Sequence, residues 1–281
     1  MQQLGNVIGL YVYPIKSCAG ITLERAPLDA RGIVHDRRWM IVSDDEHERG
    51  LFLSQRELPQ MATIRPRLTD DALIIGAPQM PELRISLTQR ADARTMPVIV
   101  WDDACLAHDE GDEAANWLRR CLGVPARLVR MVDGFVRPVD PFYAGVGAQT
   151  SFSDGFPLLI IAQASLEDLN TRLTARGKAA VPMARFRPNI VVGACAAFAE
   201  DRWQRIHIGG LSFDVVKPCK RCAITTVDPA SGTIPDHEEP LATLATYRRG
   251  PRGGVIFGQN AIHRVQGTLT LGADITDDTT S

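Results

Sequence analysis

The chain contains 281 residues, which predicts about two domains at roughly 150 residues each. Hydrophobic residues make up 45% and charged residues 23%, so the chain can bury a core and wholesale disorder is excluded. The net charge of −2 comes from 31 basic and 33 acidic residues, and this balance gives no compositional support for nucleic-acid binding.

The sequence shows no sign of a membrane or secretory segment. No stretch approaches the ~18 uninterrupted apolar residues of a membrane span. The start lacks the basic region and the small-residue cleavage site of a signal peptide. Six cysteines are too few for a disulfide scaffold in a chain of this length. We therefore expect a cytoplasmic protein that binds no membrane.

The first third of the chain predicts short β-strands. Apolar runs at residues 7–13, 33–42, 73–75, 83–87 and 97–101 are separated by Pro, Gly or Asp, a pattern typical of a barrel or sandwich. A helix is expected to follow, with Asp112 as its cap and Gly123 just beyond its end. We place the domain boundary there, which gives one domain at residues 1–125 and a second at 126–276.

The second part predicts further strands with peripheral helices. The clearest helix covers residues 165–176, where Ser165 and Asp168 resemble a capping box. A shorter helix is expected after Pro240, and residues 276–281 are expected to form a frayed polar tail. The fold class is therefore mostly β with some α, and the expected strands cover residues 126–131, 157–161, 189–193, 206–216, 223–227, 255–257 and 262–271.

The strongest local signal is the segment Lys-Pro-Cys-Lys-Arg-Cys at residues 217–222. Cationic neighbours favour the thiolate, which is the form that binds metals and acts as a nucleophile. Four interpretations stay open: two buried core thiols, a zinc site, a redox pair, or one thiolate on a soft metal whose anionic cofactor binds the cations. A structural zinc site needs four ligands, and the sequence has no second Cys-x-x-Cys. A redox pair usually precedes a helix, whereas residues 223–227 predict a strand.

Three other segments place cationic side chains in turns. They are Lys16 with Ser17 after the first strand, residues 36–39 (Asp-Arg-Arg-Trp), and residues 185–189 (Arg-Phe-Arg-Pro-Asn). Arginine can bind phosphate with two hydrogen bonds, so each segment is a candidate anion binder, with a solvated or ion-paired surface as the alternative. The glycines of a P-loop are absent.

Taken in this order, the segments at 13–17, 36–39, 186–190 and 219–229 resemble MOSC-domain proteins. The similarity is to the branch with an N-terminal MOSC β-barrel domain, which includes mitochondrial amidoxime-reducing components and bacterial proteins that detoxify N-hydroxylated bases. The resemblance implies a MOSC N-terminal β-barrel-like domain followed by a MOSC β-barrel domain. It also implies a molybdenum cofactor, which is a phosphorylated pterin whose dithiolene holds the metal.

The resemblance also implies the site residues. It assigns the metal-ligating thiol to Cys222 and leaves Cys219 as an accessory thiol. Asp228, which is close to Cys222 in sequence, is a candidate proton relay. The cofactor-binding residues that it implies are Lys16, Ser17, Arg37, Asp154, Gly155, Phe156, Arg187, Asn189, Lys220, Arg221 and Asn260.

The reaction that the resemblance implies is the reduction of hydroxylaminopurines, amidoximes or hydroxylamines. In it, R–NHOH, two electrons and two protons give R–NH2 and water. No cysteine follows Cys222, so the cysteine pattern of a plant-type ferredoxin is missing and no iron–sulfur cluster is expected in this chain. The electrons are therefore expected from a separate reductase or ferredoxin-type protein. The alternative is a carrier of the cofactor or of sulfur without turnover, similar to the C-terminal part of molybdenum cofactor sulfurases.

Overall fold

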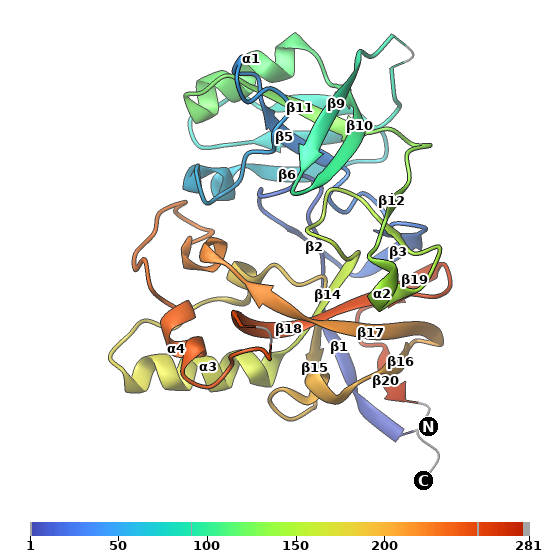
Figure 1. Cartoon of the computed structure of the whole chain (residues 1–281), viewed down its shortest axis with the longest axis vertical. Coiled ribbons are helices and arrows are strands. Elements are labelled where there is room, and N and C mark those ends of the chain that lie inside the picture. Colours follow the sequence, from blue (N-terminus) through green and yellow to red (C-terminus); the bar gives the residue numbers. More distant parts are fainter. Residues whose placement is uncertain (1, 91, 252, 278–281) are drawn as a thin grey trace.

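A β-barrel forms one part of the computed structural model, which describes residues 2–90, 92–251 and 253–277 (Figure 1). Within these residues, seven strands close on themselves in the order β15–β14–β18–β17–β16–β20–β1, because β1 also pairs with β15. Only the pairing of β14 with β15 is parallel. The strands are β1 (Gln2–Val12), β14 (Leu158–Ala162), β15 (Ile190–Gly193), β16 (Arg205–Ile208), β17 (Leu211–Arg221), β18 (Val255–His263) and β20 (Asp274–Asp277).

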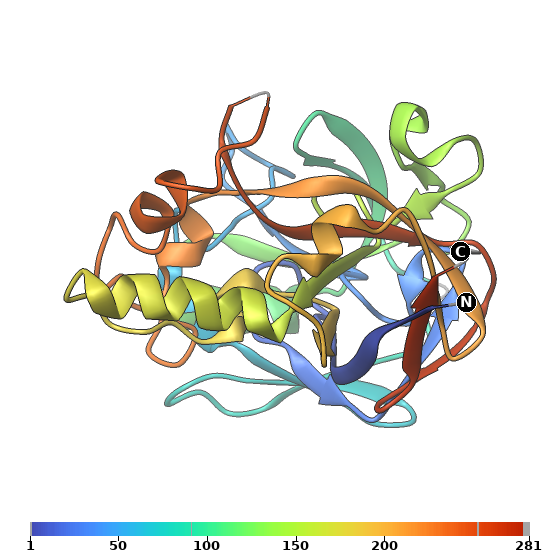
Figure 2. The ribbon, with the colours of Figure 1, turned by 90° about the horizontal axis from the view of Figure 1, so that it is seen from below.

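Strand β14 shows how the barrel is covered on both faces. Leu158 and Ile160 belong to the apolar cluster inside the barrel, because side chains alternate between the two faces of a strand. Leu159 and Ile161 pack on the other face with α3 (Gln163–Ala175) and α4 (Leu241–Ala245). Figure 2 shows α3 lying along the outside of the barrel. Burial on both faces explains why this run contains no polar residue.

A second part of the molecule lies above the barrel in Figure 1. In the described residues it contains the sheet β5–β11–β10–β9 and the sheet β6–β7–β8, with α1 (Asp112–Leu122) packed against their shared core. The strands are β5 (Trp39–Ser43), β6 (Arg65–Leu68), β7 (Ala72–Gly76), β8 (Leu83–Ser86), β9 (Thr95–Val100), β10 (Asp103–Asp109) and β11 (Ala126–Met131).

Smaller elements join the two parts. β2 pairs with the end of β1, β3 pairs with β4 and β19, and β12 pairs with β13. Their bounds, with that of the short helix α2, are β2 (Ile21–Leu23), β3 (Arg25–Asp29), β4 (Gly32–Ile33), β12 (Arg137–Pro138), α2 (Pro141–Ala144), β13 (Gln149–Thr150) and β19 (Gly267–Thr270).

Strands are exchanged across the expected boundary after residue 125. β1 comes from the first segment of the chain but belongs to the barrel, whereas β11 follows the boundary and pairs with β5 and β10. The division into residues 1–125 and 126–276 therefore stays a prediction, and it does not coincide with the two parts of the structure. The expected fold class, mostly β with few helices, is confirmed.

Several expected strands are wrong over part of their length, and one, at residues 223–227, contains no strand residue. Residues 34–38 form a turn, because the Asp36 carboxylate accepts the N–H of Tyr13 at 2.9 Å and the Arg37 N–H donates to the Tyr13 carbonyl at 2.8 Å. The segment 223–227 contains the 3-10 helix η4 (Ala223–Thr226) instead. There the Cys222 carbonyl accepts the N–H of Thr225 at 3.1 Å and its hydroxyl at 3.0 Å, a local bond that competes with strand pairing.

The expected helix caps are also wrong in detail. The N-cap of α1 is Gly111 rather than Asp112, while Gly123 does end the helix with a φ of 77°. Helix α3 begins before Ser165, whose hydroxyl donates to Glu200 instead of capping the helix. In the expected frayed tail, residues 276 and 277 belong to β20, and residues 278–281 lie outside the described residues.

None of the helices in the described part of the chain has both the length and the apolar character that crossing a bilayer needs.

Candidate functional site

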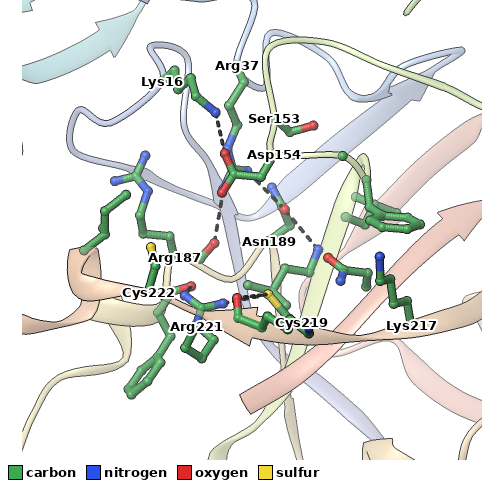
Figure 3. Close-up of a pocket in the computed structure, with 18 of the residues that line it drawn as sticks. Lys16, Arg37, Ser153, Asp154, Arg187, Asn189, Lys217, Cys219, Arg221 and Cys222 are labelled. Carbon is green, nitrogen blue, oxygen red and sulfur yellow. Dashed lines mark hydrogen bonds and ion pairs between the residues drawn. The ribbon is translucent and has the colours of Figure 1, made fainter. Parts of the chain in front are cut away.

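A cavity of about 310 Å³ lies where loops of the upper part meet the barrel (Figure 3). Its wall combines the loop after β1, the turn before β5, the segments that lead into β14 and β15, and the paired strands β17 and β18. All the predicted cofactor-binding residues line this cavity, as do Cys219 and Cys222. The structure thus brings together side chains that lie up to 244 residues apart, from Lys16 to Asn260, while their individual roles stay predictions.

Asn189 and Asp36 hold Arg37 in position at the cavity wall. The Arg37 guanidinium donates to the Asp36 carboxylate at 2.6 Å and to the Asn189 side-chain oxygen at 3.1 Å. The Asn189 amide group donates to Asp36 at 3.1 Å and to the Tyr11 carbonyl at 3.2 Å. Asn189 is 1% exposed, so its amide orients Arg37 and presents almost no surface to the cavity itself.

Arg187 presents an unsatisfied cation to the cavity. It follows the 3-10 helix η2 (Met183–Phe186) with a φ of 56°, and its guanidinium stacks 4.3 Å from the centroid of the Tyr13 ring. Nη1 donates to the Cys18 carbonyl at 2.6 Å, whereas the buried Nη2 finds no partner among the described residues. Burial, and then the charge of Arg37, lower the pKa of Arg187 to about 10. An anionic ligand would relieve both the unmade hydrogen bond and the charge repulsion.

Lys16, Asp154 and Trp101 form a hydrogen-bonded group at the mouth of the cavity. The buried Lys16 ammonium donates to Asp154 Oδ1 at 2.5 Å and to the Phe152 carbonyl at 2.9 Å. The Trp101 indole N–H donates to the same Asp154 oxygen at 3.0 Å. Burial lowers the pKa of Lys16, and the charge of Asp154 opposes this shift.

The pKa of Asp154 results from opposing effects. Partial desolvation by the surrounding protein raises it, but the charge of Lys16 and the hydrogen bonds from Lys16 and Trp101 outweigh this and hold it below its usual range. The Asp154 side chain is 68% exposed, so the ionised carboxylate remains in contact with solvent at the mouth. Figure 3 shows Asp154 between Lys16 and the thiol-bearing strand β17.

Cys219 and Cys222 lie at the end of β17, and both are free and partly buried. Arg221 Nη1 donates to the Cys219 sulfur at 2.9 Å, and Nη2 donates to the Phe186 carbonyl at 2.7 Å. The Nε of Arg221 is buried and has no partner among the described residues. A second guanidinium with an unmade hydrogen bond therefore lies beside the thiols.

The structure reduces the four interpretations of the Cys219 and Cys222 pair. Full burial in the core is wrong, because both side chains line the cavity. The described ranges contain no group of three or more His, Cys, Asp or Glu side chains placed to hold a metal, so they supply no protein ligand set for zinc. A redox pair stays open, because Cys222 is followed by the 3-10 helix η4 and not by the expected strand.

Asp228 is not brought to the cavity. Its carboxylate accepts the N–H groups of Ala230 and Ser231, each at 2.9 Å, and lies 3.7 Å from Arg185. These backbone bonds first, and then Arg185, hold the pKa of Asp228 below its usual range. The proximity of Asp228 to Cys222 in sequence is misleading, because the chain turns away after η4, and the geometry gives no support for a proton relay.

Several lining residues lie outside the predicted cofactor-binding set. Lys217 lies over the Tyr143 and Phe156 rings, with its ammonium 4.2 and 5.5 Å from their centroids. Phe52 and Trp101 come from the upper part of the molecule. A bulky aromatic residue at the tip of the β9–β10 hairpin, where Gly or Asn is typical, was the available signal for Trp101.

The fold and the cavity together define a two-part β-barrel protein with a cationic, thiol-bearing site. The family model of the MOSC N-terminal beta barrel domain matches residues 4–125, and that of the MOSC domain matches residues 147–276. The chain therefore belongs to the MOSC family, and the resemblance inferred from the sequence motifs is confirmed.

Curated relatives align over most of the chain. It is 36% identical over 256 residues to mitochondrial amidoxime reducing component 2 of Bos taurus, covering 88% of this chain and 74% of that protein. It is 34% identical over 287 residues to mitochondrial amidoxime-reducing component 1 of Mus musculus, covering 97% and 82%. Molybdenum cofactor sulfurase of Solanum lycopersicum is 32% identical over 264 residues, which cover 88% of this chain but 32% of that protein.

Proposed function

We propose that this protein holds a molybdenum cofactor in the cavity and reduces N-hydroxylated compounds with electrons from a separate protein. The similarity to amidoxime-reducing components over 88–97% of the chain supports the reaction class, because an amidoxime is an amidine that carries an N–OH group. The candidate substrates are amidoximes, hydroxylamines and hydroxylaminopurines, and a detoxifying role in the cytoplasm belongs to the same proposal. Six free cysteines fit a reducing compartment.

The observation that carries the proposal is the donor set of one cavity. It combines free thiols with partly buried cations, two of which, Arg187 and Arg221, have a buried guanidinium N–H group that lacks a partner among the described residues. A phosphorylated pterin would offer acceptors to these groups, and a soft metal would accept a thiolate. The residues present therefore fit the cofactor, with Cys222 as metal ligand and Lys16, Arg37, Arg187 and Arg221 as anion binders.

The cofactor, when bound, would supply the two-electron redox chemistry that amino-acid side chains lack. The chain would supply position and charge. Asp36 and Asn189 fix Arg37, and Phe186 fixes Arg221, so these cations are held in place before any ligand arrives. Lys16 holds a proton on Nζ against the Asp154 carboxylate at the mouth, where the substrate must enter.

A carrier without turnover is the second candidate. The similarity to molybdenum cofactor sulfurase favours it, since that match also spans 88% of this chain. A carrier needs the same anion-binding cavity but no access for an N-hydroxylated substrate. Both candidates would use the same cavity, so activity decides between them.

The test compares molybdenum content and reductase activity of the wild type, Cys222→Ala and the matched Cys219→Ala, after expression in a host that makes the cofactor. We expect about one molybdenum per chain in the wild type and in Cys219→Ala, and little in Cys222→Ala. Reduction of benzamidoxime by reduced viologen should follow the metal content. Molybdenum without reduction would favour the carrier, and equal damage from both substitutions would favour a zinc or thiol-redox site.

A further inference from the structure

We propose that Trp101 and Phe52 form an aromatic platform at the mouth of the cavity that stacks the flat, conjugated part of an N-hydroxylated substrate. The inference rests on the proposed reductase function and narrows its substrate class. Aryl amidoximes and hydroxylaminopurines would be preferred over aliphatic compounds with the same N–OH group.

The position of Trp101 is unusual for a bulky side chain. It occupies the two-residue turn between β9 and β10, where Val100 pairs with Asp103, and its φ is 57°. This left-handed conformation favours Gly or Asn, and a bulky residue is strained there. Trp101 is 40% exposed, so burial in a core does not explain why a tryptophan occupies this turn.

The contacts of Trp101 point to the cavity instead. Its N–H donates to Asp154 at 3.0 Å, and its ring centroid lies 5.1 Å from that of Phe52 at an interplanar angle of 58°. The Arg56 guanidinium lies 4.6 Å from the Trp101 centroid and 5.7 Å from the Phe52 centroid. Trp101 and Phe52 line the cavity, whereas Arg56 lies outside its described lining. Arg56 packs against both rings, and the Lys16 ammonium also lies 5.1 Å from the Phe52 centroid, so the 40% exposed Trp101 presents the main stacking face.

The chemistry of this group suits a flat ring with N–H donors. Stacking on an indole needs a π face and tolerates different ring systems. The exposed Asp154 carboxylate beside the platform can accept the N–H groups that amidoximes and hydroxylaminopurines carry. An aliphatic amidoxime keeps the N–H groups but has no ring to stack. The preference for a ring should therefore depend on Trp101 and Phe52.

Two substrates isolate this preference, because benzamidoxime and acetamidoxime share one reacting group and differ in a phenyl or a methyl substituent. The measured quantity is the ratio of their kcat/KM values. Trp101→Gly removes the indole ring, and glycine suits the left-handed backbone at this position. Loss of the ring should lower the ratio roughly tenfold, which is the scale of one stacked ring. Phe52→Leu should lower it less. Leu106→Ala, an exposed apolar change on the same hairpin, should leave it unchanged.

Trp101→Phe separates the ring from the N–H group. It keeps a π face but cannot donate to Asp154, so the platform predicts that most of the preference survives. If Trp101→Phe loses the preference as fully as Trp101→Gly, the indole acts only by holding Asp154 and the inference is overturned. It is also overturned if Trp101→Gly lowers the molybdenum content, because the ring would then serve the cofactor.

A binding measurement keeps this inference separate from the reductase function. Benzamidine and acetamidine, the products of the two reductions, can be titrated into the molybdenum-loaded protein by calorimetry. Tighter binding of benzamidine that is lost in Trp101→Gly supports the platform even if no amidoxime is reduced, in which case the proposed function alone fails. Reduction of both amidoximes with a ratio unaffected by Trp101→Gly leaves the proposed function intact and refutes the platform.

Discussion

Replacing Asn189 by alanine should destabilise the fold and loosen the cation at the cavity wall. The buried amide makes four hydrogen bonds: it accepts from Arg37 and from the Leu159 N–H, and it donates to Asp36 and to the Tyr11 carbonyl, at 3.1–3.2 Å. Neutral bonds contribute about 1 kcal/mol each and bonds to charged groups about 1.5–3 kcal/mol. Neighbouring bonds do not add fully, so we expect a net loss of about 3–4 kcal/mol.

Asn170→Ala is the matched control. Asn170 also bridges two segments, but its amide bonds only with the backbone of Val181, donating at 3.0 Å and accepting at 2.8 Å. Two neutral bonds predict a loss of about 1–2 kcal/mol. Urea unfolding followed by circular dichroism measures both losses, and the melting temperature should fall by roughly 5–7 °C in Asn189→Ala. A loss in Asn189→Ala no larger than in Asn170→Ala would refute the reasoning.

The same variant tests how Asn189 serves the site. Its oxygen and its amide hydrogens are already engaged by protein groups, so its effect on the cofactor should pass through Arg37. Asn189→Ala and Arg37→Ala should then lose molybdenum to a similar degree, and the double variant should lose little more. Full stability combined with loss of molybdenum in Asn189→Ala would instead assign the amide a direct contact with the cofactor.

Three further predictions concern titratable groups. Burial raises the pKa of the four other thiols, so iodoacetamide at about pH 8 should alkylate Cys219 and Cys222 first, and peptide mass spectrometry would contradict this by finding even labelling. The lowered pKa of Asp154 means that its ion pair with Lys16 stabilises the fold above the ordinary carboxyl pKa and is lost in acid. The stability difference between wild type and Asp154→Asn should therefore shrink from about pH 6 to about pH 3 in urea titrations. Burial raises the pKa of Glu200, so the stability that its protonated carboxyl contributes to the fold is present in acid and is lost as the pH rises. Glu200→Gln should therefore gain stability relative to wild type from about pH 4 to about pH 7, and an equal effect at both pH values would refute this.

Local sequence patterns predicted the elements that depend on one clear feature, such as a strand buried on both faces or a glycine that ends a helix. The run at 158–162 is apolar because both faces of β14 are covered, and Gly123 ends α1 because its φ of 77° suits glycine. The segment 223–227 was wrong, because its β-branched residues favour strands only where pairing partners exist. There the Thr225 and Thr226 side chains bond to carbonyls three residues earlier and close a 3-10 turn.

The candidate site was predictable only in part. Its cationic and thiol-bearing segments carry recognisable motifs, and the fold brings those segments to one cavity. Asp228 was misplaced because distance along the chain is a poor guide to distance in space after a turn. Trp101 and Phe52 were missed because they reach the cavity from the β9–β10 hairpin and a neighbouring loop, and no local pattern shows which loop will meet the barrel.

Backbone strain is concentrated at the same cavity. Eight non-glycine residues of the described chain have positive φ, and four of them, Ser17, Arg37, Trp101 and Arg187, line this one site. Each such conformation costs of order 1–3 kcal/mol in sparsely populated regions. Arg187 also retains an unmade hydrogen bond, and burial lowers its pKa. A fold selected for stability alone would place glycine at the strained turns and neutral side chains at the buried positions. The chain instead keeps rigid cations and an indole around one opening, which is the arrangement that a preorganised anion site with a stacking surface requires.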